Sequence, residues 1–296
     1  MSLKVSFITI NYNSSKYTIE LIRSILKYTS LAYEIIVVDN KSKVTDFVKL
    51  EDFTSTKKNI QLIKNSVNEG FSSGNMLGAK YAKGEYFFFI NNDTQLLNDT
   101  SLFLTNYLDS HVRVALATAK VNDENGNFSS SYKLFPSLTK ELFGNSIARK
   151  LSTHNFPSNK MKLEVPTLVE VVSGSCMFFR AVDFKKLGGF DKSFFLYCEE
   201  EDLSKRVWND GKEVVFIPEA EILHYSGGST KKSFEIEREY YISYHILIKK
   251  HFNITAYMIL RGLILFKLFR RSFKRKNGFK LFLCGLKGCP SILSLR

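Results

Sequence analysis

The first hundred residues alternate between short, nearly unbroken apolar runs and longer segments whose apolar residues recur at helical spacing. The runs read KVSFITI at residues 4–10, EIIVV at 34–38 and EYFFFI at 85–90, with a weaker one at 61–64. Apolar strands without polar alternation are typical of a parallel sheet that helices cover on both faces. The pattern therefore predicts an α/β fold with a mainly parallel central sheet.

Polar residues stand directly where two of these runs stop. Asp39 and Asn40 follow one, and Asn91, Asn92 and Asp93 follow another. Ligands of such sheets bind at the carboxyl ends of the strands, and a carboxylate there suits Mg²⁺ or Mn²⁺. The alternative is an Asx turn, which for Asp39 taken alone is the better interpretation.

A glycine-rich segment, NEGFSSGN at residues 68–75, leads into a predicted helix. Gly70 and Gly74 would let the backbone approach a phosphate at the helix N-terminus. The segment lacks the Lys-Ser/Thr pair of a P-loop, so an ordinary strand-to-helix turn is the competing interpretation.

Four consecutive carboxylates, Glu199 to Asp202, are the most unusual local feature. Such a run raises at least one pKa, and apolar and aromatic residues flank it, so one member is a candidate general base. A solvated acidic surface is the alternative. A helix is predicted over 203–208 and a last strand over 214–217 that stops at Pro218. His224 comes after this strand and can converge with Asp93 on a metal, although a lone histidine is more often structural.

Six segments in this order resemble family 2 glycosyltransferases of the rhamnosyltransferase-like branch. They are VVDNKS (37–42), NEGFSSGN (68–75), INND (90–93), SGSCMFFR (173–180), GGFDKSFFLYCEEEDLSKR (188–206) and HYSGGS (224–229). The resemblance covers about residues 4–230. It implies a GT-A fold with a Rossmann-like nucleotide half, and inversion at the anomeric carbon by direct displacement.

The resemblance also implies roles for individual residues. Asp93 would bind Mn²⁺ or Mg²⁺ with His224, and Asn91 stands where the family's D-x-D often has its first Asp. Glu200 would be the general base although the family usually has Asp there, with Glu199 as the fallback. The predicted nucleotide-sugar contacts are Thr9, Asn11, Asp39, Asn40, Gly70, Gly74, Asn75, Asn91, Asn92, Gly174, Ser175 and Asp202.

The expected activity is metal-dependent transfer of a single hexose or deoxyhexose. The donor would be a UDP- or dTDP-sugar, and the acceptor a glycan or lipid-linked glycan of cell-surface polysaccharide synthesis. Processive relatives usually carry Q-x-x-R-W, whereas Lys-Arg-Val precedes Trp208 here. We expect a catalytic domain over 1–235 and a basic helical segment over 236–296.

Charge is concentrated at the C-terminal end. The formal net charge is +13, and residues 240–296 contain twelve Lys and Arg and no Asp or Glu, which leaves +1 for residues 1–239. A helix is predicted over 254–269, too interrupted by charge to span a bilayer. The segment suits a peripheral helix on an anionic leaflet, here the inner face of the cytoplasmic membrane, or a helical cap on the catalytic domain. No nucleic-acid module is visible, so nucleic acid is not an expected partner.

Two other functions remain open from the sequence. A nucleotidyltransferase would want a glycine in the first loop, and residues 11–15 have none. A degenerate module that binds sugar or membrane without turnover is allowed by Asn91 and Glu200.

Overall fold

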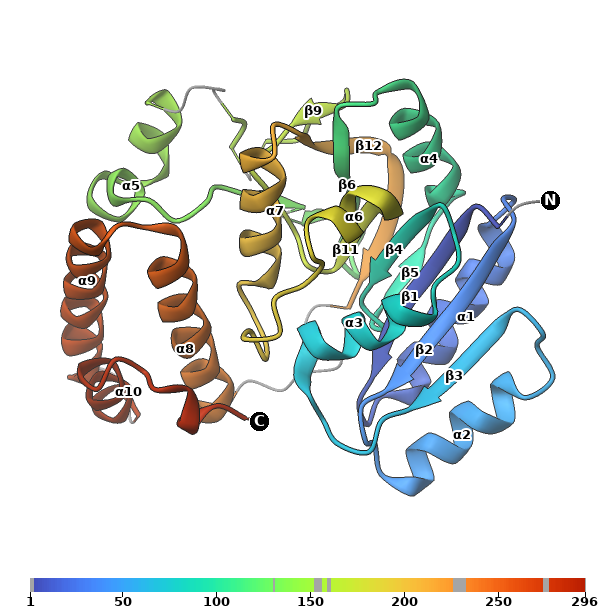
Figure 1. Ribbon diagram of the computed structural model, residues 1–296, viewed down its shortest axis with the longest axis horizontal. Helices are drawn as coiled ribbons and strands as arrows, with labels where there is room; N and C mark the ends of the chain where they lie inside the picture. The colour runs from blue at the N-terminus through green and yellow to red at the C-terminus, as the bar shows by residue number, and fades with distance from the viewer. Residues whose placement is uncertain are drawn as a thin grey trace.

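The computed structural model describes residues 3–129, 131–151, 156–158, 161–225, 233–273 and 277–295. Strands and helices alternate through the first half of the chain, and three helices follow the last strand (Figure 1). The elements in order are β1 Val5–Asn11, α1 Ser15–Tyr28, β2 Tyr33–Asp39, α2 Val44–Thr54, β3 Ile60–Lys64, α3 Gly70–Tyr81, β4 Tyr86–Ile90, β5 Thr94–Leu96, α4 Thr100–Ser110, β6 Val114–Asn122, β7 Phe128–Ser129, β8 Tyr132–Lys133, α5 Leu138–Lys150, β9 Thr167–Leu168, β10 Val171–Val172, β11 Cys176–Arg180, α6 Ala181–Lys186, α7 Glu199–Asn209, β12 Glu213–His224, α8 Phe234–His251, α9 Ile254–Ser272, α10 Gly278–Leu286 and the 3₁₀ turn Ser291–Leu293.

One large mixed sheet runs in the order β3-β2-β1-β4-β11-β6-β12-β5. The pairs β3–β2, β2–β1, β1–β4 and β6–β12 are parallel, whereas β11 runs antiparallel to both of its neighbours. The predicted α/β fold with a mainly parallel central sheet is therefore confirmed.

Successive residues of the central strands face opposite sides of the sheet, as the pleat requires. Phe7 packs with buried residues of α1, α2 and α4, and the next residue, Ile8, packs on the other side. That second side is covered by α3, α6 and α7. Because both faces are covered, the strands contain apolar residues at nearly every position.

The last strand corrects one prediction. The sequence places its end at Pro218, but β12 continues to His224. A shift in register between Ile217 and Glu221 lets β12 bulge around the proline, which has no N–H to donate. The strand then pairs with β5, so that His224 lies opposite Thr94.

The segment without a clear sequence pattern, residues 121–167, contains β7, β8 and α5. Strand β8 pairs with β10 in a separate two-stranded sheet. Helix α5 begins at Leu138, with the Ser137 side chain accepting a hydrogen bond from the Lys140 N–H. It buries none of its residues and bends at Gly144, whose φ is 81°.

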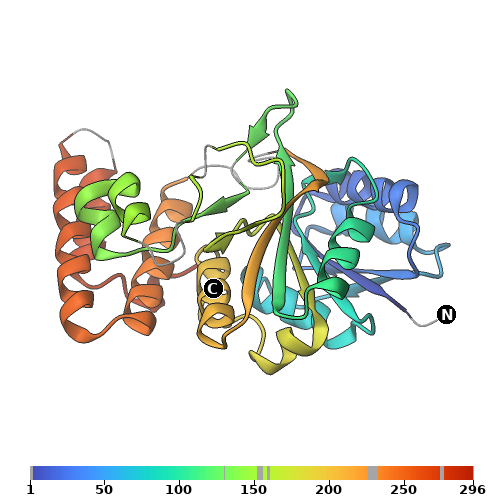
Figure 2. The same ribbon diagram turned by 90° about the horizontal axis from the view of Figure 1, so that it is seen from above.

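The C-terminal helices α8, α9 and α10 lie with α5 at one end of the sheet (Figures 1 and 2). Leu247 and Ile248 of α8 share a buried cluster with Leu260 of α9 and with Phe194 and Cys198 of the preceding half. These helices thus pack on the sheet-bearing half, as the helical-cap interpretation expects. Within the described part of the chain, no helix combines the length and apolarity that crossing a bilayer requires. The domain division at residue 235 stays a prediction.

Candidate active site

A pocket of about 440 Å³ lies at the carboxyl ends of β1, β2 and β4. Its walls come from both halves of the chain. The lining residues are Ile10, Tyr12, Ser14, Asn40, Asn68, Gly70, Phe71, Asn75, Ile90, Asn91, Asn92, Phe195, Leu196, Ser233, Glu235, Ile236 and Leu295. Five of the predicted nucleotide-sugar contacts, Asn40, Gly70, Asn75, Asn91 and Asn92, are among them.

Asp93 and His224, the two predicted metal ligands, lie together. The Nε2 atom of His224 is 3.3 Å from Oδ1 of Asp93, whose side chain is 2% exposed. Two backbone features fix this proximity: the register of His224 opposite Thr94 and a hydrogen bond of 2.9 Å from the Tyr225 N–H to the Asp93 carbonyl. Within the described ranges, no three His, Cys, Asp or Glu side chains form a metal-binding cluster. Mg²⁺ in proteins commonly keeps substrate oxygens and water among its ligands, so two protein ligands are compatible with a metal here.

Asn11 and Asp39 organise the loops beside the pocket. The Asn11 amide donates to Oδ2 of Asp39 at 2.8 Å and to Oδ2 of Asp46 at 2.9 Å, and the Ser42 N–H donates to Oδ1 of Asp39 at 2.9 Å. Asn11, Asp39 and Thr9 are all fully buried, and none of them lines the pocket. Their predicted contact with the nucleotide sugar stays a prediction, because the structure shows their bonds to the protein only.

The glycine-rich segment forms the first turn of α3. Gly70 has a φ of 79°, and a Cβ there would meet the Phe195 carbonyl oxygen at 2.2 Å. Its own carbonyl accepts from the Asn40 amide at 2.9 Å. A Cβ on Gly74 would meet Ile10 at 2.8 Å. Gly70 requires glycine, because its φ is positive and the Phe195 backbone approaches it closely, whereas at Gly74 the Ile10 side chain could move aside.

The acidic run forms the first turn of α7, where the helix dipole favours negative charge. Tyr197 and Cys198 precede it with φ of 72° and 68°. Left-handed backbone at two non-glycine residues is costly and is concentrated at functional sites. It places Glu199 in a buried position and Glu200 in a partly buried one.

The three glutamates of this turn have different charge states. Burial and the charge of Glu200 raise the pKa of Glu199 well above its ordinary value. Burial and the charge of Glu200 raise the pKa of Glu201 to about 7. Burial also opposes the charge of Glu200, but the ammonium of Lys133, with Nζ 2.9 Å from Oε1, outweighs it and holds the pKa of Glu200 below its ordinary value. Glu200 is thus the glutamate of this turn whose ionised form is favoured most.

Gly174 and Ser175 connect this turn to the segment that carries Asp93. A Cβ on Gly174 would lie 3.5 Å from the carboxyl carbon of Glu200. The Ser175 carbonyl accepts a hydrogen bond of 3.1 Å from the Asn91 N–H, two residues before Asp93. The structure therefore brings together Glu200, the 173–175 loop and the end of β4.

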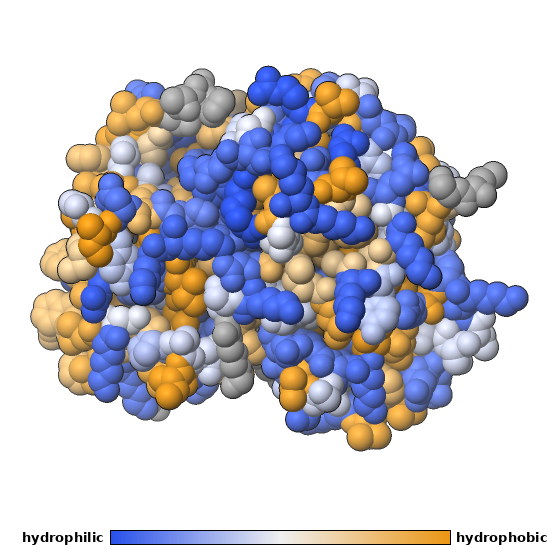
Figure 3. Space-filling view, in the orientation of Figure 1, coloured by the Kyte–Doolittle hydropathy of each residue, from blue (hydrophilic) through white to orange (hydrophobic). Residues whose placement is uncertain are grey.

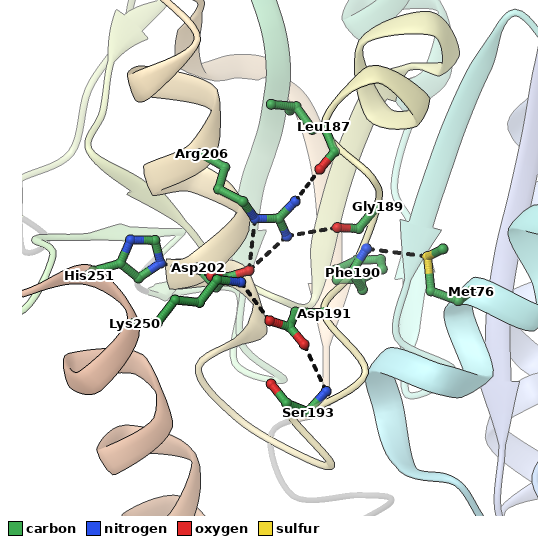
Figure 4. A network of polar contacts seen from close by, with 10 residues as sticks. All are labelled: Met76, Leu187, Gly189, Phe190, Asp191, Ser193, Asp202, Arg206, Lys250 and His251. Atoms are coloured by element: carbon green, nitrogen blue, oxygen red, sulfur yellow. Dashed lines mark hydrogen bonds and ion pairs between the residues drawn. The ribbon is translucent and has the colours of Figure 1, made fainter.

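Asp202 occupies a different environment, which Figure 4 shows. Its carboxylate is fully buried and lies 2.7 Å from both Arg206 and Lys250 and 2.8 Å from Nε2 of His251. Although burial opposes its charge, the bond from His251 and the charge of Arg206 lower the pKa of Asp202. Asp202 does not line the pocket, and its contacts join α7 to α8. We therefore assign it a structural role, and its contact with the nucleotide sugar stays a prediction.

Several pocket residues are absent from the sequence predictions. Phe195 and Leu196 belong to an aromatic run that the sequence displays, but no motif marked it as a pocket wall. Leu295 lines the pocket because its N–H donates to Glu239 of α8 at 2.9 Å, a carboxylate that is 1% exposed. No local signal could have found Leu295 or Lys133, since only tertiary packing brings them here.

The chain belongs to glycosyl transferase family 2, whose family model matches residues 6–188, more than half of the 296 residues. It is similar to the rhamnosyltransferase WbbL of Escherichia coli K12, with 26% identity over 68% of this chain and 76% of that protein. The chain is thus a glycosyltransferase that uses a nucleotide-sugar donor, as the resemblance implies.

Solved structures show the same fold. The chain is similar to S. aureus TarS 1-349 in complex with UDP-GlcNAc, with a TM-score of 0.60, 18% identity, and coverage of 98% of this chain and 83% of that one. It is also similar to the mannosyltransferase PcManGT of Pyrobaculum calidifontis in complex with GDP-Man and Mn²⁺, with a TM-score of 0.59, 12% identity, and coverage of 97% and 75%. At sequence identities this low, the similarity shows only that the folds are alike.

Proposed function

We propose that this chain transfers one hexose or deoxyhexose from a UDP- or dTDP-sugar to a glycan or lipid-linked glycan in cell-surface polysaccharide synthesis. The transfer inverts the anomeric carbon. The observation that carries the proposal is the pairing of Asp93 with His224 beside the pocket, with the Gly174 loop joining this pair to the Glu200 carboxylate. The similarity to a rhamnosyltransferase supports a deoxyhexose as the sugar.

Asp93 and His224 suit Mn²⁺ or Mg²⁺ because a buried carboxylate oxygen and an imidazole nitrogen are 3.3 Å apart. When bound, the metal would neutralise the diphosphate leaving group. PcManGT, which has a similar fold, was solved in complex with GDP-Man and Mn²⁺.

Glu200 is the proposed base. The acceptor hydroxyl gives its proton to the Glu200 carboxylate while the hydroxyl oxygen forms a bond to the anomeric carbon of the donor sugar. The bond between the anomeric carbon and the diphosphate breaks at the same time, and its electron pair stays on the departing diphosphate. Glu199 is less suited to this role, since burial and the charge of Glu200 raise its pKa and favour its protonated form.

A donor screen tests the proposal. The protein is incubated with UDP-, dTDP- and GDP-sugars, with Mn²⁺, Mg²⁺ or chelator, and released nucleoside diphosphate is measured. We expect metal-dependent release from one donor, lost in Asp93→Ala and kept in Asp210→Ala, a carboxylate at the far end of α7 that pairs with Lys186. A shift in melting temperature without release would mean that the acceptor is required. Absence of both release and binding across the panel would favour a degenerate binding module.

Helix α9 supports a membrane-docking role for the C-terminal helices. One stripe, Leu260, Ile264 and Leu268, is buried. A second apolar stripe faces outward at positions 254, 258, 266, 269 and 273, where Phe266 is 59% and Phe273 is 75% exposed. A helix that is apolar on two faces ordinarily has a partner on each.

Helix α10 extends this outward surface. Phe282 packs on Phe269 with ring centroids 5.4 Å apart, and Phe279 is 58% exposed. Figure 3 shows apolar side chains at this edge of the molecule beside hydrophilic ones. Because residues 240–296 contain twelve cations and no acid, we propose an anionic membrane surface as the partner.

Vesicle sedimentation tests the membrane proposal. We expect binding to vesicles that contain phosphatidylglycerol, much weaker binding to phosphatidylcholine alone, and loss of binding in Phe266→Ser/Phe273→Ser. The matched control is Phe103→Ser on α4, which is 40% exposed on the sheet-bearing half. Equal binding of all three proteins to both vesicles would contradict the proposal.

A further inference from the structure

Lys133 is a cation placed among carboxylates. Its Nζ lies 2.9 Å from Oε1 of Glu200 and 2.5 Å from Oε1 of Glu201. The two glutamate side chains are 12% and 9% exposed. Burial opposes the charge of Lys133, but these two carboxylates outweigh it and raise the pKa of Lys133 well above its ordinary value. The ammonium therefore stays charged throughout the pH range of an enzyme assay.

The two-stranded sheet fixes where this ammonium lies. Strand β8 pairs Lys133 with Val171 of β10, and the Ser173 N–H donates to the Ser131 carbonyl at 2.8 Å. Strand β10 continues directly into Gly174, which faces Glu200. One small sheet thus carries both the cation and the loop that contact the candidate base.

Other charged and titratable groups around Glu200 do not replace Lys133. On its own helix, Glu199 and Glu201 are like charges. The neighbouring groups from the same turn, from α8 and from α5 are Tyr197, Cys198, Tyr240 and Lys140. Burial and the nearby charge of Lys133 lower the pKa of Lys140, whose Nζ donates to the Leu134 carbonyl at 2.7 Å instead of to a glutamate. Among the described residues, only Lys133 forms an ion pair with Glu200.

We propose that Lys133 is a positioning residue that anchors the Glu200 carboxylate beside Gly174 as the base for the acceptor hydroxyl. This inference rests on the proposed function. Without the ammonium, burial and the neighbouring glutamates would favour the protonated form of Glu200, and a protonated carboxyl cannot accept the acceptor proton.

The test is the pH dependence of transfer in four proteins: wild type, Lys133→Met, Lys133→Gln and Lys133→Arg. Activity requires ionised Glu200 and is lost below its pKa, so a higher pKa moves the acid limb of kcat/KM to higher pH. We expect a move of about one pH unit or more in Lys133→Met and Lys133→Gln, which is about tenfold in rate on the limb. Lys133→Arg should restore the wild-type limb, and the Kd for the donor should stay unchanged. The control is Lys212→Met. In the wild type, Lys212 pairs with Asp183 and lies just before the first residue of β12, at the end of the strand away from His224.

A second measurement does not depend on turnover. NMR titration of ¹³C-labelled glutamate carboxyls should show one buried carboxyl titrating at higher pH in Lys133→Met. This shift without any donor turnover by wild type would refute the proposed function and leave the anchoring intact. Superimposable pH profiles and titrations of wild type and Lys133→Met would overturn the inference. The inference would also be overturned if Lys133→Met lost the same fraction of activity at every pH and had a lower melting temperature, and if Lys133→Arg did not restore the activity.

Discussion

Helices α1 and α9 bury similar apolar stripes but differ in what they expose. Helix α1 buries Leu21, Ile22 and Ile25 against the sheet, and its other face is mostly polar. Helix α9 buries Leu260 completely and leaves Phe266 59% exposed. Helix α1 thus has one apolar face, which packs on the sheet, whereas α9 has a second apolar face that is exposed.

The largest expected effect distinguishes the residues of the reaction site from the exposed residues of α9. Asp93→Ala should lower donor turnover by roughly 10²–10³-fold, since a lost metal ligand removes several kcal/mol of transition-state stabilisation. Phe266→Ser should leave turnover of a water-soluble acceptor within about twofold. Steady-state kinetics with both variants checks this. Comparable losses would mean that α9 contributes to the reaction itself.

The two faces of α9 should differ in stability. Leu260→Ala deletes a fully buried side chain and should lower the free energy of unfolding by about 2–5 kcal/mol. Phe266→Ala, on the exposed stripe, should change it by about 0.5 kcal/mol or less. Urea unfolding measures both. A large loss in Phe266→Ala would show that the outward stripe already has a partner in solution, such as a second copy of the chain.

In the sheet-bearing half, substitution of Gly70, which another part of the backbone approaches closely, should destabilise the protein more than substitution of Gly126, a glycine with open space around it. Gly70→Ala places a Cβ 2.2 Å from the Phe195 carbonyl at a φ of 79°. Gly126→Ala meets the same backbone strain at a φ of 76°, but nothing lies within 4 Å. We expect about 1–3 kcal/mol of destabilisation from strain at either position, with an additional loss and weaker donor binding at Gly70 alone. Thermal unfolding and donor titration check this, and equal effects would contradict it.

The smallest effect concerns the contact between the two regions. Lys250 of α8 pairs with Asp191 at 2.6 Å, and although burial opposes the charge, this pair and the bonds from Ser193 lower the pKa of Asp191 to about 2. Since the folded pKa lies below the ordinary 3.8, the stabilisation is present above that value and is lost as pH falls towards 2. Asp191→Asn should therefore cost about 1 kcal/mol at neutral pH, after allowance for partial exposure, and progressively less between about pH 4 and 2. Unfolding free energies of both proteins across this range provide the measurement, and a constant difference would assign the loss to something other than charge.

The sequence predicted the fold better in the first ninety residues than in the rest of the chain. In the first ninety residues, apolar strands and amphipathic helices are local patterns, and β1 to β4, α1 and α3 lie where those patterns place them, whereas α2 was not predicted. The end of β12 was wrong because a bulge lets a strand pass a proline, and bulges depend on the partner strand. Helix α5 was not predicted, and the structure shows that it buries none of its residues and is interrupted by a kink at Gly144.

The site divides similarly. Asp93, Asn91 and Asn92 follow an apolar strand, and this local rule led to the end of β4, where the structure also brings His224. Asp202 looked like part of one acidic site, yet helical geometry turns it away from Glu200 and towards Arg206, one turn further on. Lys133 and Leu295 lie far along the chain from the residues they accompany, and no local pattern encodes such contacts.

The position of Leu295 has a practical consequence for anyone handling this enzyme. Its backbone is held by Glu239, and the residue forms part of the wall of the pocket at the carboxyl ends of β1, β2 and β4. Proteolytic loss of Leu295 would open that wall, and we expect it to weaken donor binding while the sheet remains untouched. Intact mass should therefore be verified for each preparation before donor affinities from different preparations are compared.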